Sequence, residues 1–178
     1  MSFLVISSSL NPSSKSAILA REAYRVLQSK NVEVEWLDLR EVELPHCDGA
    51  SSYAHPNVAQ VAKAIAKASC IVLAVAIYNY DCGSSAKNLV ELTGRNAWAD
   101  KTAAFLCAAG GRSSYMSIMS LANSLMLDFR TLIVPRFVYA EGAAFGNAII
   151  HDEEINRRIE QLVDSSIKLD AAQKLTPA

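Results

Sequence analysis

Short apolar runs alternate with longer segments of helical periodicity along most of this chain, and this alternation restricts the fold more than any other feature. A run rich in β-branched residues followed by an amphipathic helix is the repeating unit of a parallel sheet. The run at residues 70–75 is apolar at every position, as expected for a central strand covered by helices on both faces. The pattern therefore predicts an α/β fold with five strands and five helices.

The order of these elements predicts the topology. Strands are expected at residues 3–6, 32–37, 70–75, 102–108 and 131–138. Helices are expected at residues 14–29, 57–68, 84–93, 114–127 and 152–168, with Gly94 ending the third. Right-handed crossovers of this length favour a three-layer sandwich around a five-stranded parallel sheet of order 2-1-3-4-5.

Length and composition fit one folded domain. The chain has 178 residues, of which 51% are hydrophobic and 20% charged, enough apolar surface to build one core. We expect a single domain at residues 1–170. Residues 171–178 are expected to be a frayed tail, because Pro177 cannot continue a helix and little apolar surface remains to pack them.

Charge and cysteine usage exclude several partners. The net charge is −1 without a basic stripe, so nucleic acid is not expected. The longest apolar stretch, residues 70–78, is far shorter than the roughly 20 residues that span a bilayer, so no membrane partner is expected. The first residues do not resemble a signal peptide, and the four cysteines are scattered. A cytoplasmic protein without disulfides or a bound metal is predicted.

In open α/β sheets, ligands bind outside the carboxyl ends of the strands. The loop after the first strand places hydroxyls, an amide and a cation at a helix N-terminus, which favours an anion. Residues 7–16 contain no glycine, so they suit a terminal monophosphate better than an internal pyrophosphate, and FMN fits best among the nucleotide cofactors. The alternative is that Ser13 or Ser14 only caps the helix. The candidate ligands are Ser9, Asn11, Ser14, Lys15 and Ser16.

The loop after the third strand combines aromatic rings with an amide. A flat ring system with a polar edge needs both kinds of group. The alternative is that Tyr78 and Tyr80 only cover the edge of the sheet, and Cys82 is interpreted as a packing residue of the loop. The candidate residues are Ile77, Tyr78, Asn79, Tyr80, Cys82 and Gly83.

The loop after the fourth strand has two adjacent glycines, where backbone can lie against a ring. Its N–H groups would stabilise negative charge that develops on the ring edge, and Arg112 would add to that field. Alternatively, Arg112 is an ordinary exposed charge. The candidate residues are Ala109, Gly110, Gly111 and Arg112.

These three loops together resemble the NADPH-dependent FMN reductase family of flavodoxin-like proteins, over about residues 3–138. Ser9 and Ser14 match the family's phosphate-loop hydroxyls, and Gly110 and Gly111 match its ring-edge turn. Tyr78 and Asn79 match the pair bordering the flavin, and the Lys87–Asn88 pair follows at the family spacing. The resemblance implies a flavodoxin-like fold, FMN as cofactor and NADPH or NADH as co-substrate.

The sequence also departs from the family pattern. Asn11 stands where arginine is common, and Ala76 and Gly83 stand where proline is common. Losing the arginine lowers the expected phosphate affinity, and losing both prolines leaves the second loop less preorganised. FMN is therefore expected either to bind weakly or to exchange as a substrate.

The expected activity needs no catalytic side chain, because FMN supplies the redox chemistry. We expect an NAD(P)H-dependent oxidoreductase with a flavin, quinone or similar small-molecule acceptor. One alternative is a non-enzymatic electron-transfer protein or a flavin-free interaction protein on the same fold. Another is an activated serine at the S-x-x-K spacing of Ser84 and Lys87, whose companion motifs are absent. Apolar faces on the third and fourth helices predict a homodimer or homotetramer.

Overall fold

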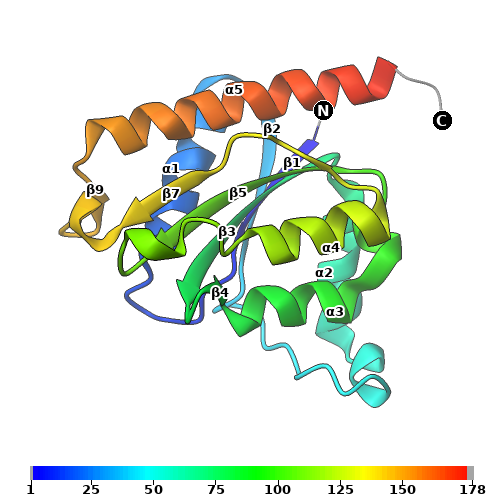
Figure 1. The fold of residues 1–178 in the computed structure, drawn as a ribbon. Coiled ribbons are helices and arrows are strands. Elements are labelled where there is room, and N and C mark those ends of the chain that lie inside the picture. Colours follow the sequence, from blue (N-terminus) through cyan, green and yellow to red (C-terminus); the bar gives the residue numbers. More distant parts are fainter. Residues whose placement is uncertain (1, 176–178) are drawn as a thin grey trace.

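The computed structural model describes residues 2–175 and has a parallel sheet at its centre (Figure 1). The strand order β2-β1-β3-β5-β6 is the expected 2-1-3-4-5 order, so the predicted fold class is confirmed. The strands of the main path are β1 (Ser2–Ser7), β2 (Glu33–Asp38), β3 (Cys70–Tyr78), β5 (Thr102–Ala109) and β6 (Leu132–Ile133).

Helices cover both faces of the sheet. Helices α1 and α5 lie on one face, and α2, α3 and α4 lie on the other (Figure 1). Short 3₁₀ turns are η1 (Ser51–Ala54), η2 (Arg112–Ser114) and η3 (Gly142–Ala144). The helices are α1 (Lys15–Ser29), α2 (Pro56–Lys67), α3 (Ser84–Trp98), α4 (Met119–Phe129) and α5 (Glu153–Leu175).

Alternation along the strands divides the core into two layers. In β1, Leu4 and Ile6 pack under α2, α3 and α4, whereas Phe3 and Val5 pack under α1 and α5. Successive side chains of a strand point to opposite faces, so a strand with helices on both sides is apolar throughout. In β3 this pattern buries every residue from Cys70 to Ile77.

The fifth strand differs from the prediction. The expected strand at residues 131–138 is divided into β6 and β7 (Val138–Glu141), which both pair with β5. Ile133 pairs with Ala103 and Val138 with Leu106, so five steps along this segment match three along β5. Pro135 lies in the bulge, where its missing N–H breaks no ladder bond.

Helices α3 and α4, which lie on the same face of the sheet, also differ from the prediction in their bounds. Helix α4 begins at Met119, after the η2 turn, rather than at residue 114. Helix α3 continues to Trp98, but Gly94 interrupts it with a φ of 63° and a ψ of −171°. The expected end at Gly94 is therefore a kink followed by one further turn.

The expected frayed tail at residues 171–178 is wrong for residues 171–175, which complete α5. Gln173 is held by polar contacts, because its Nε2 donates to the carbonyl of Asp100 at 2.7 Å and its Oε1 lies 2.9 Å from Thr102 Oγ1. Lys174 pairs with Asp170 at 2.9 Å. These contacts replace the apolar packing that the sequence lacks there. Residues 176–178 lie outside the described part of the chain.

Two small hairpins complete the structure. The strand β4 (Asp81–Cys82) folds back on the end of β3, and β8 (Phe145–Gly146) pairs with β9 (Ile149–Ile150). Within residues 2–175, no helix has both the length and the apolar content that crossing a membrane requires.

Candidate functional site

The three predicted loops meet at one edge of the sheet. Strands β1, β3 and β5 are adjacent and parallel, with Ser7 paired to Ala74 and Ala76 paired to Ala108. Their carboxyl ends therefore place the loops at residues 8–14, 79–83 and 110–118 side by side. This is the edge at which α/β sheets bind ligands.

The first loop leads directly into α1. Ser14 is the N-cap of this helix, because its Oγ accepts the N–H of Ala17 at 3.1 Å. Its Oγ also lies 2.9 Å from Ser16 Oγ, and both side chains are buried. The capping role weighed from the sequence is thus real for Ser14. The amides of Lys15 and Ser16 in the first turn have no intrahelical acceptor and are the donors that an anion at this helix end would use.

The upstream part of the loop is folded by its own side chains. Asn11 Oδ1 accepts the N–H of Ser13 at 2.9 Å, and its carbonyl accepts that of Ser14 at 3.1 Å. Ser9 Oγ accepts the N–H of Asn11 at 3.3 Å. The loop is therefore shaped before any ligand arrives, with Ser9 buried and Asn11 and Lys15 exposed.

Hydrogen bonds join the first loop to the third strand and its helix. Ser8 donates both its N–H, at 3.1 Å, and its hydroxyl, at 2.7 Å, to the carbonyl of Ala74. Ser85 donates its hydroxyl to the carbonyl of Ser8 at 2.5 Å. The start of α3 is thus tied to the loop that precedes α1, which fixes the spacing between the two predicted ligand loops.

The loop after β3 is a tight hairpin that the sequence did not predict. Tyr78 pairs with Asp81, and the two residues between them, Asn79 and Tyr80, have φ values of 49° and 62°. Two consecutive residues with positive φ form a type I′ turn, which is costly for residues other than glycine. Backbone strain of this kind persists where the surroundings impose it, and it concentrates at ligand sites.

The aromatic side chains of this hairpin are exposed rather than packed over the sheet. Tyr78 is 55% exposed and Tyr80 is 66% exposed, so both rings are accessible to a ligand. Gly83 lies beneath Tyr78, because a Cβ at Gly83 would be 3.6 Å from the Tyr78 ring and 3.3 Å from the carbonyl of Ala76. Ile77 is buried in the core and contributes its backbone position only.

The surroundings of Cys82 do not favour a nucleophilic thiolate. Burial, with a further contribution from the neighbouring Asp81, raises the pKa of the Cys82 thiol to about 11. A thiol with this pKa is protonated at neutral pH, and the thiolate is the reactive form. The interpretation of Cys82 as a packing residue fits this environment.

The loop after β5 is joined to the β3 hairpin and to the strand β7. Tyr80 Oη lies 3.3 Å from Ser113 Oγ, which links this loop to the β3 hairpin, and the hydroxyl of Tyr139 donates to the carbonyl of Gly111. Ala109 is buried, Gly110 is exposed, and no atom lies within 4 Å of a Cβ placed at Gly110 or Gly111. The space over the two glycines is therefore open.

Arg112 has a 92% exposed side chain, and its Nε lies 2.8 Å from Glu141 Oε1. The reading of Arg112 as an exposed charge agrees with this position. Because Glu141 partly neutralises it, its field at the candidate site is weaker than the sequence indicated.

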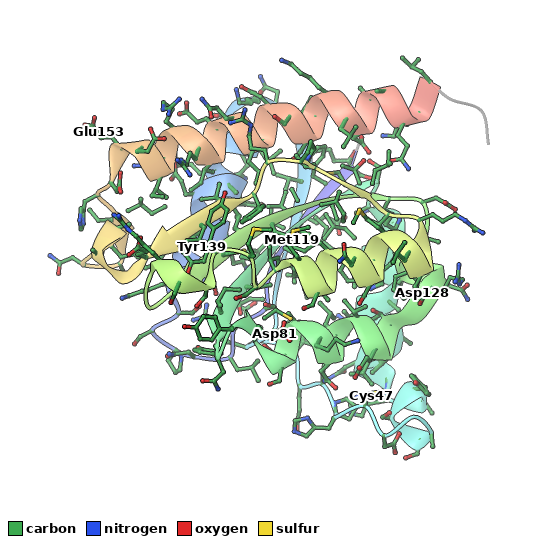
Figure 2. All side chains as sticks on the ribbon, in the orientation of Figure 1. Cys47, Asp81, Met119, Asp128, Tyr139 and Glu153 are labelled. Atoms are coloured by element: carbon green, nitrogen blue, oxygen red, sulfur yellow. The ribbon has the colours of Figure 1, made fainter. Side chains whose placement is uncertain are left out.

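Sequence reasoning missed the residues at the end of β7. Tyr139, Glu141 and Gly142 reach the same edge, because β7 is parallel to β5 and adjacent to it. Figure 2 shows Tyr139 and Asp81 toward one end of the sheet, with Asp128 toward the other. The signal that would have found them was present, since a parallel strand next to β5 must also point its carboxyl end at the ligand loops.

The Lys87–Asn88 pair has structural contacts. Asn88 accepts the N–H of Cys47 at 2.8 Å and donates to the carbonyl of Pro45 at 2.9 Å, so it holds the segment that follows β2. Lys87 Nζ lies 3.2 Å from Glu91 Oε1. Its ammonium is thus engaged along α3, which does not favour the alternative in which Lys87 activates Ser84.

The chemistry of the donors fits a phosphorylated flavin. Hydroxyls and free first-turn amides at α1 match a terminal phosphate, and exposed tyrosines with open glycine backbone match a flat ring. Within residues 2–175, no group of three or more His, Cys, Asp or Glu side chains could hold a metal ion.

Comparisons with known proteins agree with this geometry. The model of the family described as NADPH-dependent FMN reductase matches residues 1–145. An NAD(P)H:quinone oxidoreductase of Solanum tuberosum is 27% identical over 140 residues, covering 74% of this chain and 72% of the relative. A probable NADPH:quinone oxidoreductase 1 of Oryza sativa subsp. japonica is 28% identical over 154 residues, covering 82% of this chain and 76% of the relative.

Among solved structures, the flavoenzyme FerB from Paracoccus denitrificans, an NAD(P)H:(acceptor) oxidoreductase, has the same fold. It superposes with a TM-score of 0.78 at 19% identity, over 97% of this chain and 98% of that chain.

Proposed function

Because the chain belongs to the NADPH-dependent FMN reductase family, we propose that it is an NAD(P)H-dependent oxidoreductase that holds FMN where the three loops meet and reduces a flavin, a quinone or a similar small acceptor. The observation that carries this proposal is the convergence of the loops after β1, β3 and β5, joined by the Ser85–Ser8 and Tyr80–Ser113 contacts. The family and both plant quinone reductases favour an enzyme over a flavin-free interaction protein.

The start of α1 would hold the phosphate. Ser9, Asn11, Ser14 and Ser16 supply hydroxyl and amide groups, and the Lys15 ammonium supplies the counter-charge in place of the family arginine. Hydrogen bonds to a charged group contribute about 1.5–3 kcal/mol each, so two or three of them account for binding without an arginine. No residue of this loop moves a proton.

The β3 hairpin and the glycine turn would hold the ring. Tyr78 and Tyr80 would contact its apolar part, while backbone groups of Asn79 and Gly83 would meet its polar edge. The N–H groups near Gly110 and Gly111 would stabilise negative charge on the ring. When bound, FMN supplies the hydride and electron transfer, and the side chains position it and leave one face open to the two substrates in turn.

Assembly and location stay predictions. A homodimer or homotetramer in the cytoplasm is proposed, in which a second copy covers the part of the ring that this chain leaves open. Leu127 of α4 is 84% exposed, and Met116, which precedes α4, is 60% exposed. Both side chains supply apolar surface for that contact.

Titration with FMN tests the site. We expect saturable binding by calorimetry, and oxidation of NADPH or NADH in the presence of a quinone or free flavin. In the double variant Ser9→Ala, Ser14→Ala, FMN affinity should fall about tenfold or more, because two hydrogen bonds to the phosphate are lost.

Two single variants make this test specific. Ser9→Ala does not touch the cap of α1, so it separates phosphate binding from helix stability. Ser13→Ala is the matched control and should bind FMN like the native protein, because Ser13 contacts Asn11 Oδ1 through its backbone N–H and not through its hydroxyl. Unchanged binding by the double variant would remove this loop from the site, and no saturation up to millimolar FMN would overturn the proposal.

A further inference from the structure

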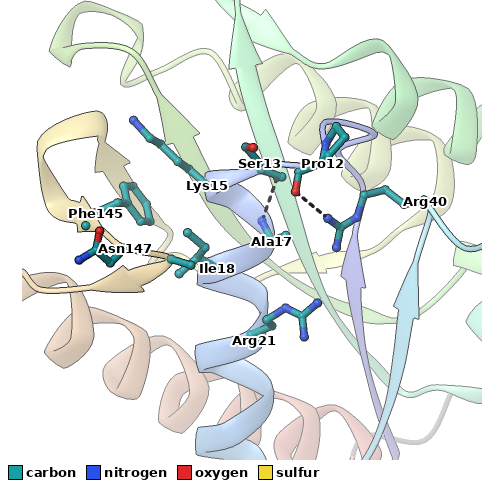
Figure 3. Close-up of a pocket in the computed structure, with 12 residues that line it drawn as sticks. Pro12, Ser13, Lys15, Ala17, Ile18, Arg21, Arg40, Phe145 and Asn147 are labelled. Carbon is teal, nitrogen blue, oxygen red and sulfur yellow. Dashed lines mark hydrogen bonds between the residues drawn. The ribbon is translucent and has the colours of Figure 1, made fainter.

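A cavity of about 610 Å³ lies between the start of α1 and the β8–β9 hairpin (Figure 3). Three cationic side chains, Lys15, Arg21 and Arg40, line it together with the apolar Ile18 and Phe145. We propose that this cavity binds the 2′-phosphoadenosine end of NADPH. This assignment rests on the proposed function, because it gives a place to the part of the co-substrate that does not react.

The cavity carries positive charge, of which Lys15 would be shared with the flavin phosphate and Arg21 is the cation left for the nucleotide. No Asp or Glu side chain lines it, and no ion pair formed within residues 2–175 includes Lys15 or Arg21. Lys15 Nζ is 3.5 Å from the carbonyl of Gly142 and 5.9 Å from the Phe145 ring centroid. Arg21 lies 5.5 Å from the Trp36 ring centroid. Only Arg40 already has a carboxylate partner, the buried Asp38.

The shape of the lining fits a phosphate attached to an aromatic base. Figure 3 shows Lys15 on the side of Phe145, Arg40 on the other side of the helix start, and Arg21 further along α1. Guanidinium groups bind phosphate through paired donors, and the apolar side chains of Ile18 and Phe145 offer a surface to an adenine ring. Asn147, which also lines the cavity, adds an amide.

The cavity adjoins the proposed flavin site without overlapping its ring loops. Ser14 and Lys15 line the cavity and also belong to the candidate phosphate loop, so the cavity begins where the flavin phosphate would end. The proposal requires a dinucleotide with its nicotinamide at the ring to extend back over α1. The family model ends at residue 145, so the hairpin wall from Gly146 to Ala148 lies beyond the matched region.

A second basic cavity, of about 530 Å³, provides the control. Arg136, Arg157 and Arg158 line it, but each guanidinium already has a side-chain hydrogen-bond partner. Arg157 and Arg158 both pair with Glu154, at 2.6 and 2.9 Å, and Arg136 donates to Gln161 at 2.6 Å. A phosphate bound in this cavity would have to displace these contacts.

Calorimetry with adenosine 2′,5′-bisphosphate tests the assignment without turnover. The protein, with and without saturating FMN, is titrated with this compound, with 5′-AMP and with inorganic phosphate. We expect the bisphosphate to bind at least tenfold more tightly than 5′-AMP or phosphate alone. Arg21→Gln should remove about tenfold of that affinity, because a charge-assisted contact is lost. Arg157→Gln should keep the native affinity.

Kinetics give a second readout. In Arg21→Gln, the KM for NADPH should rise about tenfold relative to the KM for NADH, since NADH lacks the 2′-phosphate. Equal affinity for the bisphosphate and 5′-AMP, or an equal loss in Arg157→Gln, would overturn the assignment. Failure of FMN to bind would instead count against the proposed function, because nucleotide binding is measured separately from it.

Discussion

The charge of the buried Asp38 depends mainly on Arg40, with a smaller contribution from the charge of Arg21. The side chain is buried, and burial alone would raise the pKa of the carboxyl, but hydrogen bonds from Arg40 and its positive charge hold the pKa below its ordinary value. Arg40 Nε lies 3.0 Å from Asp38 Oδ1, and its Nη1 donates to the carbonyl of Pro12 at 3.2 Å. The pair therefore fixes the end of β2 against the first ligand loop.

Replacing Arg40 with methionine should expose this dependence. In the native protein, the lowered pKa gives stability above the ordinary pKa of Asp, which is lost as pH falls through the folded-state pKa. In Arg40→Met, the backbone N–H of residue 40 and the charge of Arg21 still favour the carboxylate, but the guanidinium that chiefly opposes burial is lost. The pKa of Asp38 therefore rises, and the loss of stability grows as pH rises. We expect a loss of about 3 kcal/mol at pH 7 and a smaller loss at pH 4, measured by urea unfolding.

An exposed pair is the control for this change. Arg25 and Glu22 lie 2.6 Å apart, with 63% of the Arg25 side chain exposed. Arg25→Met should cost less than about 1 kcal/mol at both values of pH, because exposed ion pairs contribute little. An equal loss in the two variants, or a loss in Arg40→Met that does not change with pH, would contradict this account of Asp38.

At the residue scale, the sequence predicted which loops carry polar and aromatic groups but not how they contact one another. Ser14 followed from its place before a helix, a local property. The contact of Tyr80 with Ser113, and that of Tyr139 with Gly111, join residues far apart in the chain. No local pattern marks such contacts, so Tyr139 was missed.

At the scale of single elements, the ends of helices and strands decide how the site is shaped. Strand β5 and helix α1 were predicted to within about one residue at each end, because their apolar patterns are regular. Strand β3 begins where it was predicted but continues to Tyr78, past the expected end at residue 75. Helix α4 begins later than expected, at Met119, and has no side-chain cap. The division of β6 from β7 at Pro135 depends on register with β5, which the segment itself does not encode.

The kink in α3 predicts how replacing Gly94 changes the stability of the protein. The φ of 63° and ψ of −171° at Gly94 belong to a region that only glycine adopts readily. Gly94→Ala should lower the free energy of unfolding by about 1–3 kcal/mol, although the added Cβ meets no atom within 4 Å outside the adjoining backbone of α3. The cause is backbone strain and not a clash. Thermal or urea unfolding measures it.

Gly110→Ala is the matched control, because a Cβ there also meets no atom within 4 Å and its φ lies outside the left-handed region. It should change stability by less than about 0.5 kcal/mol. A Gly94→Ala protein as stable as the native one would show that α3 straightens without cost.

At the scale of the whole molecule, the sheet edge that carries the three loops could be predicted from the sequence, whereas the cavity beside α1 could not. The sheet edge with its loops was predicted because parallel topology alone brings the carboxyl ends together. The cavity beside α1 could not be predicted, because its far wall is the β8–β9 hairpin, which follows the last predicted strand. The two central residues of its turn, Asn147 and Ala148, have φ values of 48° and 62°, and neither of them is a glycine.

The proposed assembly uses the face that carries α4. Leu127 projects from this helix with 84% exposure, and Leu175, with the same exposure, ends α5 on the opposite face of the sheet. If a second copy covers α4, Leu127→Asp should convert the assembly to monomers in light scattering, because a buried carboxylate without a partner is strongly unfavourable. Leu175→Asp should leave the assembly unchanged.

Circular dichroism of both variants should match the native protein, since neither side chain contributes to the core. A native protein that is monomeric at micromolar concentration, or a loss of assembly only in Leu175→Asp, would place the contact elsewhere.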